Sequence, residues 1–143
     1  MPLDLTSSRA PEPVGAFPHA KRVGDLLFLS GIGPRKRGSK DIPGAVTDAA
    51  GNLIDYSIEA EMRSCFENIR TILDEAGSRW DNIVDVQVFL TDMKRDWPNY
   101  NRVYAEFFPP GPNQPTRTTV EVSALPTGGN TPIHFEIKII ATA

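Results

Sequence analysis

The sequence of 143 residues is poor in the residues that form disulfides and bind metals, because it contains one cysteine and two histidines. The single cysteine, Cys65, excludes an internal disulfide. It belongs to an apolar series at helical spacing, which is typical of a small buried side chain rather than a nucleophile. His19 and His134 belong to no cluster with metal-ligand spacing, and neither CxxC nor HExxH occurs. The sequence therefore predicts no metal site.

The sequence also lacks phosphate-binding glycine motifs, long apolar runs and an excess of positive charge. Neither GxGxxG nor GxxxxGK[ST] occurs, so we expect no cofactor. No apolar run approaches the roughly 20 residues of a membrane span. Residues 1–17 show neither the charged nor the apolar region of a secretory signal. The formal net charge of -3 disfavours nucleic acid and anionic membranes as partners. Together these absences predict a soluble, cytoplasmic protein with no nucleic-acid or membrane partner.

What the chain does contain fits one globular domain over residues 1–143, since 40% of its residues are apolar and 23% are charged. Residues 1–16 are rich in proline and predict an extended arm. The β-prone runs 19–23 and 26–30 flank Gly24-Asp25 and predict a hairpin. Residues 33–56 are rich in glycine, proline and basic side chains, and predict a long loop.

The second part of the chain predicts two helices and three strands. A helix is expected from about Ser57, as its N-cap, to Ala76, before Gly77. A second helix is expected to have Asp96 as its N-cap and Pro98 in its first turn, and to stop at the prolines of 109–115. The strand between the helices should place one set of side chains on one face, namely Val84, Val86, Val88 and Leu90. Strands over 117–122 and 133–141 end the chain. The expected fold is α+β, with two helices on one face of a mixed sheet.

Two charged residues interrupt the last two strands. Arg117 keeps its charge near neutral pH and has a planar fork that matches a carboxylate. Glu136 lies in an otherwise apolar strand, where a carboxylate is costly without a partner or a task. One interpretation is a carboxylate clamp beside a proton-carrying acid, which suits a small amino or imino acid. The other is a buried ion pair between neighbouring strands.

Strand alternation predicts which face these residues occupy. In the last strand, Glu136 points away from Phe135 and Ile137. In the strand before it, Arg117 points away from Thr118 and Val120. If the helices cover the apolar faces, both charged residues project from the uncovered face. Such a face needs another partner, so we expect an oligomer with polar pockets where subunits meet.

Several stretches together resemble the RidA family, also called the YjgF family. They follow one another in the family's order and cover nearly the whole chain: APEPVGAFPHAKRVGDLLFLSGIGP, NIVDVQVFLTDM, NRVYAEFFP, PTRTTVEVSALP and FEIKIIA. The resemblance implies a chorismate-mutase-like α+β fold and a homotrimer with active sites between subunits. It also implies hydrolysis of enamines or imines derived from amino acids.

The resemblance assigns site residues. The arginine that clamps the substrate carboxylate corresponds to Arg117, and the glutamate that activates water corresponds to Glu136. Ser30 and Gly31 correspond to the pair near which the family binds ligand through backbone groups. The asparagine of the second helix corresponds to Asn101. Phe17 stands where the family usually has tyrosine, so it keeps a wall for a planar ligand without the hydroxyl.

The long loop after Gly31 is similar to that of the 2-aminomuconate deaminase branch, which acts on a six-carbon dicarboxylate. Four basic residues of the loop offer charge to a second carboxylate, or simply keep the loop in water: Arg35, Lys36, Arg37 and Lys40. The prediction is hydrolytic deamination of 2-aminomuconate to 4-oxalocrotonate (2-oxohex-3-enedioate) and ammonia, without cofactor. Two alternatives stay open. One is a general deaminase of 2-imino acids such as 2-iminopropionate, and the other is a non-enzymatic trimer that binds small carboxylates. Glu121 is the rival carboxylate, for which we expect a structural role.

Overall fold

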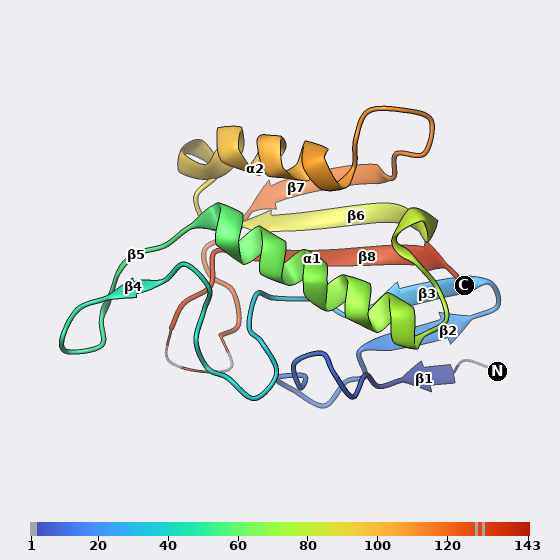
Figure 1. Cartoon of the computed structure of the whole chain (residues 1–143), viewed down its shortest axis with the longest axis horizontal. Coiled ribbons are helices and arrows are strands. Elements are labelled where there is room, and N and C mark those ends of the chain that lie inside the picture. Colours follow the sequence, from blue (N-terminus) through green and yellow to red (C-terminus); the bar gives the residue numbers. More distant parts are fainter. Residues whose placement is uncertain (1–2, 128, 130) are drawn as a thin grey trace.

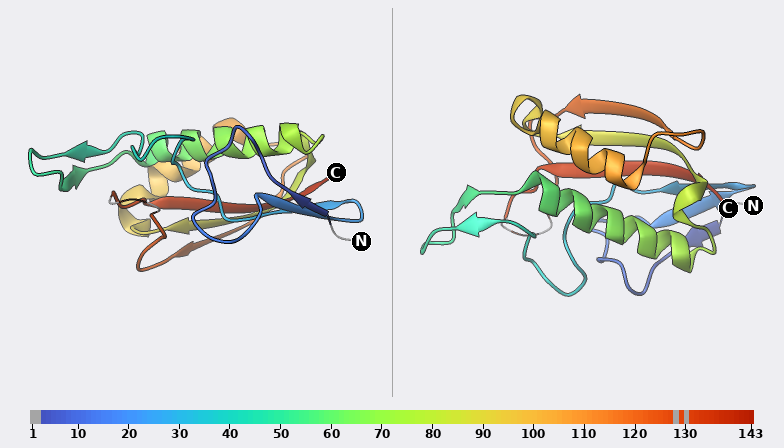
Figure 2. Two further views of the ribbon diagram at one scale, coloured as in Figure 1. Left: turned by 90° about the horizontal axis from the view of Figure 1, so that it is seen from below. Right: turned by 45° about the horizontal axis from the view of Figure 1, so that its top comes forward.

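The computed structural model describes residues 3–127, 129 and 131–143, and within them one six-stranded sheet carries two helices on one face (Figures 1 and 2). The sheet order is β1-β2-β3-β8-β6-β7, and only the β6–β7 pair is parallel. A mixed sheet with a layer of helices on one face confirms the predicted α+β fold class. No helix among these residues is long and apolar enough to span a bilayer.

The first half of the chain holds two strand pairs that the sequence did not predict. In the arm, β1 (Leu3–Leu5) pairs with β2 (Ala20–Val23), which forms the predicted hairpin with β3 (Leu26–Leu29). Inside the expected loop, β4 (Val46–Thr47) and β5 (Leu53–Asp55) form a short hairpin that projects from the body (Figure 2). Asp48 closes its turn by accepting the backbone N–H groups of Ala50 and Asn52. This aspartate turn was the missed signal.

The first helix agrees with the prediction. α1 runs over Ile58–Glu75, and the Ser57 hydroxyl accepts the N–H of Ala60. Gly77 follows the helix with φ of +77°, a left-handed conformation that only glycine adopts without strain.

The second helix starts earlier than predicted. α2 spans Met93–Phe107, and its N-cap is Asp92, whose carboxylate accepts the N–H of Arg95. The assignment of Asp96 as the cap is wrong because Asp96 is buried inside the helix and accepts a hydrogen bond from the Tyr56 hydroxyl. Pro98 therefore lies beyond the first turn, where it removes one helix hydrogen bond.

The strand after α1 is β6 (Ile83–Leu90), and Ile83 takes the core position that the sequence predicted for Val84. The register against β8 (Phe135–Thr142) shifts between Ile83 and Asp85. This irregularity turns Ile83 into the core and leaves Val84 42% exposed. Val86, Val88 and Leu90 are buried, as predicted.

The register also decides on which faces Arg117 and Glu136 lie. In β7 (Thr116–Glu121), Arg117 is paired with Val86 of β6, and Thr119 with Val88. Paired residues point to the same face, so Arg117 lies on the helix-covered face, while Val120 is 41% exposed on the other. The prediction that Arg117 projects from the uncovered face is therefore wrong. Its strand is at the sheet edge, and α2 covers the polar side chains of this strand instead of its valine, Val120.

β8 follows the predicted alternation. Phe135, Ile137 and Ile139 are buried against the helices, and Glu136 points the other way. The aromatic core between sheet and helices is built from Phe66 of α1 with edge-on partners, Trp80, Phe107, Phe108 and Phe135. Within one chain the sheet thus separates Arg117 from Glu136.

Candidate functional site

Glu136 lies against the corner that follows β3. A methyl group placed on Gly31 would come within 2.6 Å of its Oε2 atom, so a larger residue there would displace the carboxylate. The N–H groups of Ser30 and Ile32 donate to the carbonyls of His19 and Ile137. The N–H of Gly31 between them has no hydrogen-bond partner within the described residues. An unused donor beside a carboxylate suits a ligand that accepts hydrogen bonds.

The electrostatic state of Glu136 is unusual for a glutamate. Burial raises the pKa of its carboxyl above the ordinary value. Within residues 3–127, 129 and 131–143, no hydrogen bond or ion pair opposes this shift. A carboxyl with a raised pKa exchanges protons near neutral pH more readily than an exposed one.

A cavity of about 80 Å³ lies beside this corner, and four of the predicted site residues line it: Phe17, Ser30, Gly31 and Glu136. The N-terminal arm forms one wall with residues 10–14. Apolar side chains dominate the rest, among them Ile32 and Ile133. Ser30 donates its hydroxyl to the carbonyl of Pro18, so its side chain fixes the corner.

Arg117 and Asn101 form a separate group on the other face. The Nη1 atom of Arg117 donates to Oδ1 of Asn101 over 3.0 Å, and Asn101 is oriented by donating to the carbonyl of Trp97. The guanidinium lies 4.7 Å from the ring centre of Tyr104 and 5.1 Å from that of Tyr100. Aromatic faces hold a guanidinium without using its in-plane donors. The in-plane donors that Asn101 does not occupy stay available for a carboxylate.

The predicted site residues thus form two half-sites in one chain. The Glu136 half-site consists of Phe17, Ser30, Gly31 and Glu136, and the Arg117 half-site consists of Asn101 and Arg117. No ion pair joins Arg117 to Glu136 or to another carboxylate in the described part of the chain, so the inter-strand ion pair does not form here.

Tyr104, beside Arg117, carries a buried hydroxyl with no hydrogen-bond partner among the described residues. Burial raises the pKa of Tyr104 to about 12. An unpaired buried hydroxyl costs about 1–3 kcal/mol. We therefore expect Tyr104→Phe to leave the free energy of unfolding unchanged or to raise it, as measured by urea denaturation.

The matched variant for this test is Tyr100→Phe. The Tyr100 hydroxyl is bonded to Thr119 Oγ1 over 2.7 Å, so its removal should lower the free energy of unfolding by about 1 kcal/mol. Equal losses in the two variants would show that the Tyr104 hydroxyl has a partner after all.

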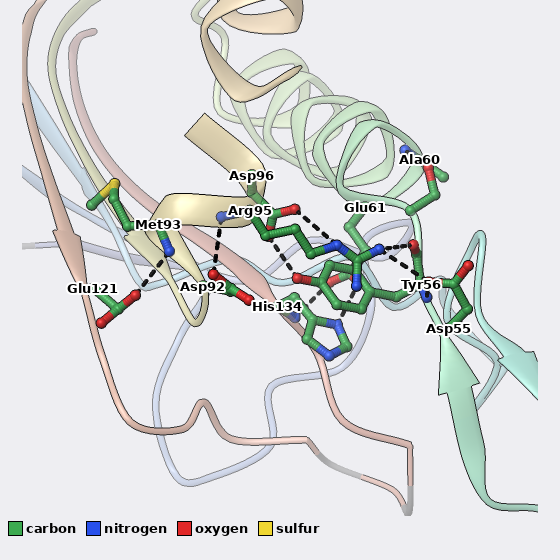
Figure 3. Close-up of polar contacts among 11 residues, drawn as sticks. Asp55, Tyr56, Ala60, Glu61, Asp92, Met93, Arg95, Asp96, Glu121 and His134 are labelled. Carbon is green, nitrogen blue, oxygen red and sulfur yellow. Dashed lines mark hydrogen bonds and ion pairs between the residues drawn. The ribbon is translucent and has the colours of Figure 1, made fainter. Parts of the chain in front are cut away.

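A polar network that the sequence did not reveal fixes the start of β8 (Figure 3). Glu61 of α1 is 0% exposed and accepts both the backbone N–H and Nδ1 of His134, over 2.7 and 2.8 Å. The His134 ring stacks on Tyr56 at 3.5 Å, and Arg95 covers the other side of Tyr56 at 3.8 Å. The signal was a glutamate inside the apolar stripe of a helix. This network orients the residue two positions before Glu136.

Glu121 and the basic loop have structural contacts. Glu121 accepts the N–H of Met93 in the first turn of α2, which agrees with a structural role. Arg35 and Arg37 donate to backbone carbonyls of the N-terminal arm, at Glu12 and Ala10. Lys36 lines a separate hollow beside α1, and the side chain of Lys40 lies near Gly129. Among the described residues, no group of three or more histidine, cysteine, aspartate or glutamate side chains is placed to hold a metal ion.

Comparison with known proteins places this architecture in one family. The sequence model of the family Endoribonuclease L-PSP matches residues 7–143. A RutC family protein of Pyrococcus horikoshii is 35% identical over 137 residues, which are 96% of this chain and 94% of the relative. YyfA of Yersinia pestis, from the conserved Rid protein family, has a crystal structure that matches with a TM-score of 0.79 and 30% identity over 100% of both chains.

A third match concerns a protein solved with a ligand. Crystalline TdcF of E. coli with bound serine matches with a TM-score of 0.80 and 27% identity, over 99% of this chain and 98% of that one. Because the family model and the RutC relative both span nearly the whole sequence, the chain belongs to the Endoribonuclease L-PSP family, which is the RidA/YjgF/RutC family that its motifs resemble.

Proposed function

We propose that this chain hydrolyses 2-imino acids and their enamine tautomers to 2-oxo acids and ammonia. The observation that carries the proposal is the Glu136 carboxyl, with its raised pKa, beside Gly31, whose N–H has no hydrogen-bond partner among the described residues. The bound serine of TdcF supports an amino-acid-like ligand for this fold. Arg117 supplies the complementary charge for the ligand's carboxylate.

The proposed chemistry needs a single acid–base group. The Glu136 carboxylate takes a proton from water while the water oxygen bonds to the carbon of the protonated imine, which gives a carbinolamine. The carboxyl then returns this proton to the carbinolamine nitrogen and the carbon–nitrogen bond breaks. Ammonia leaves, and the hydroxyl proton passes to the Glu136 carboxylate as the carbonyl forms. The Gly31 N–H and the Arg117 guanidinium hold the substrate so that its imine carbon faces the water.

Two copies must meet to complete this site, because the sheet separates the half-sites in one chain. We propose that the Arg117 half-site of one subunit faces the Glu136 half-site of its neighbour in a homotrimer. The uncovered sheet face supports this assembly, since it exposes Val23, Leu26 and Val120. A closed ring is the arrangement in which each subunit uses both of its half-sites once.

The substrate within this class is a separate matter. 2-Aminomuconate, the dicarboxylate candidate, needs a second cationic partner. The Arg35 and Arg37 side chains already bind the arm, and the cavity beside Glu136 is mostly apolar. These contacts favour a monocarboxylate such as 2-iminopropionate over 2-aminomuconate.

An assay of ammonia release tests the proposal. With 2-iminopropionate and 2-aminomuconate each generated in place by an auxiliary enzyme, we expect faster release than without the protein, and a higher kcat/KM for 2-iminopropionate. A preference for 2-aminomuconate would restore the dicarboxylate interpretation. Binding of 2-oxo acids without any ammonia release would instead indicate a non-enzymatic carboxylate binder. RNA cleavage, which the name of the family suggests, is disfavoured by the net charge of -3.

A further inference from the structure

The loop that follows Gly31 is tied to the N-terminal arm, and the arm forms a wall of the Glu136 cavity. Figure 1 shows the blue arm beside the cyan loop after β3. Arg35 donates to the carbonyl of Glu12 over 2.7 Å, and Arg37 donates to that of Ala10 over 2.8 Å. Arg37 also forms an ion pair with the Glu12 carboxylate at 3.3 Å. Three contacts therefore hold residues 10–12 in place.

The base of this loop is itself fixed on α1. Asn68 donates to the carbonyls of Gly33 and Arg35 over 3.0 and 2.9 Å, and the Ser64 hydroxyl donates to that of Pro34 over 2.6 Å. Both α1 residues are buried. The loop that carries Arg35 and Arg37 is thus anchored to the helix α1. A rigid support of this kind lets the two arginines fix the position of the arm, which forms a wall of the cavity.

The other end of the arm is held by His19. Its Nδ1 atom accepts the N–H of Ser7 over 2.9 Å, so Nε2 carries the proton and donates to the carbonyl of Pro11 over 2.6 Å. The hydroxyl of Ser7 accepts the N–H groups of Arg9 and Ala10. The backbone amides of residues 7–10 therefore report whether the arm is in place.

From these contacts we infer that Arg35 and Arg37 act as a latch that holds arm residues 10–14 over the Glu136 cavity and thereby limits the size of the side chain that a ligand can carry. The latch rests on the proposed function for the identity of the ligand, but its existence does not depend on catalysis. According to this inference, the two arginines of the loop help to select ligands by size and do not bind a second carboxylate of the substrate.

Hydrogen exchange tests whether the latch holds the arm. In Arg37→Ala, the amides of residues 7–10 should exchange about tenfold faster than in the parent chain, because loss of a charge-assisted contact raises the open population by about that factor. Glu12→Gln, which keeps the backbone contacts, should give a smaller increase. The matched control is Arg63→Ala, which removes a half-buried arginine of α1 paired with Glu59 and Glu106 away from the arm. Unchanged exchange in Arg37→Ala would overturn the latch.

Ligand binding tests whether the latch selects by size. Calorimetry with pyruvate and phenylpyruvate should show that Arg37→Ala raises the affinity for phenylpyruvate relative to pyruvate at least about fivefold, while Arg63→Ala leaves the ratio unchanged. An unchanged ratio with both acids bound would overturn size selection and leave the proposed function intact. If neither the parent chain nor the Arg37→Ala variant binds either acid, the proposed ligand class and size selection are both overturned. Faster amide exchange in Arg37→Ala would still show in that case that the latch holds the arm.

Discussion

Glu136→Gln is expected to lower kcat at least about a hundredfold, because removal of a general base typically costs 10²–10⁴-fold in rate. Glutamine keeps the shape of the side chain beside Gly31 but has no basic carboxylate. The measurement is ammonia release at saturating substrate, with binding of pyruvate checked separately. An unchanged kcat would eliminate Glu136 as the proton carrier.

The stability of this variant separates a catalytic effect from misfolding. Burial raises the pKa of Glu136 in the folded chain, so the protonated form is the one that folding favours. Its contribution to stability is complete below the unfolded pKa and is lost as the pH rises through the folded pKa. At neutral pH, glutamine should therefore be at least as stable as the native glutamate. A lower melting temperature of Glu136→Gln at pH 7 would contradict this assignment.

The same shift fixes the direction of the pH profile. The base form of Glu136 is lost as the pH falls through its raised pKa, so kcat should decline on the acid side with an inflection above 4.5. The Glu136→Gln variant should lack this inflection. An acid limb that persists in the variant would belong to another group.

Arg117→Lys is expected to lower kcat/KM by about 10–100-fold, through both binding and orientation. The arginine fork binds a carboxylate at two points, and a lysine ammonium supplies one point charge. Lysine also loses the planar contact with Tyr104 and Tyr100, together with the position fixed by Asn101. The measurement is kcat/KM for 2-iminopropionate, and pyruvate affinity should fall in parallel.

The control for this variant is Arg102→Lys. Arg102 follows Asn101 in α2 and is exposed, and its side chain contacts Glu59 and Glu106. Its replacement should leave kcat/KM within about twofold of the parent, as expected for a surface ion pair. Near-normal kcat/KM in Arg117→Lys would mean that another group binds the substrate carboxylate.

The two variants also report on the proposed assembly. If each site takes Arg117 from one subunit and Glu136 from its neighbour, trimers mixed from Arg117→Lys and Glu136→Gln chains contain some sites in which both native residues meet. Mixing after partial unfolding and refolding should then restore part of the activity that each variant lacks. No recovery in verified mixed trimers would show that both residues act from the same chain.

Local sequence signals determined most of the elements of this protein. Ser57 and Gly77 marked the ends of α1 because a cap and a left-handed glycine act within a few residues of themselves. The alternation in β8 assigned Glu136 to the face opposite Phe135 for the same local reason. The family motifs, which span the chain in order, determined the fold class.

Only the tertiary structure decided which groups come together. The face of Arg117 depends on its pairing with Val86, and the burial of Ile83 depends on an irregular register against β8, both between strands far apart in the sequence. Likewise, no pattern within residues 33–56 shows that Arg37 reaches Ala10, and no pattern within α1 shows that Glu61 meets His134. Such contacts form across the packed domain and follow from register and burial, which no short stretch of sequence encodes by itself.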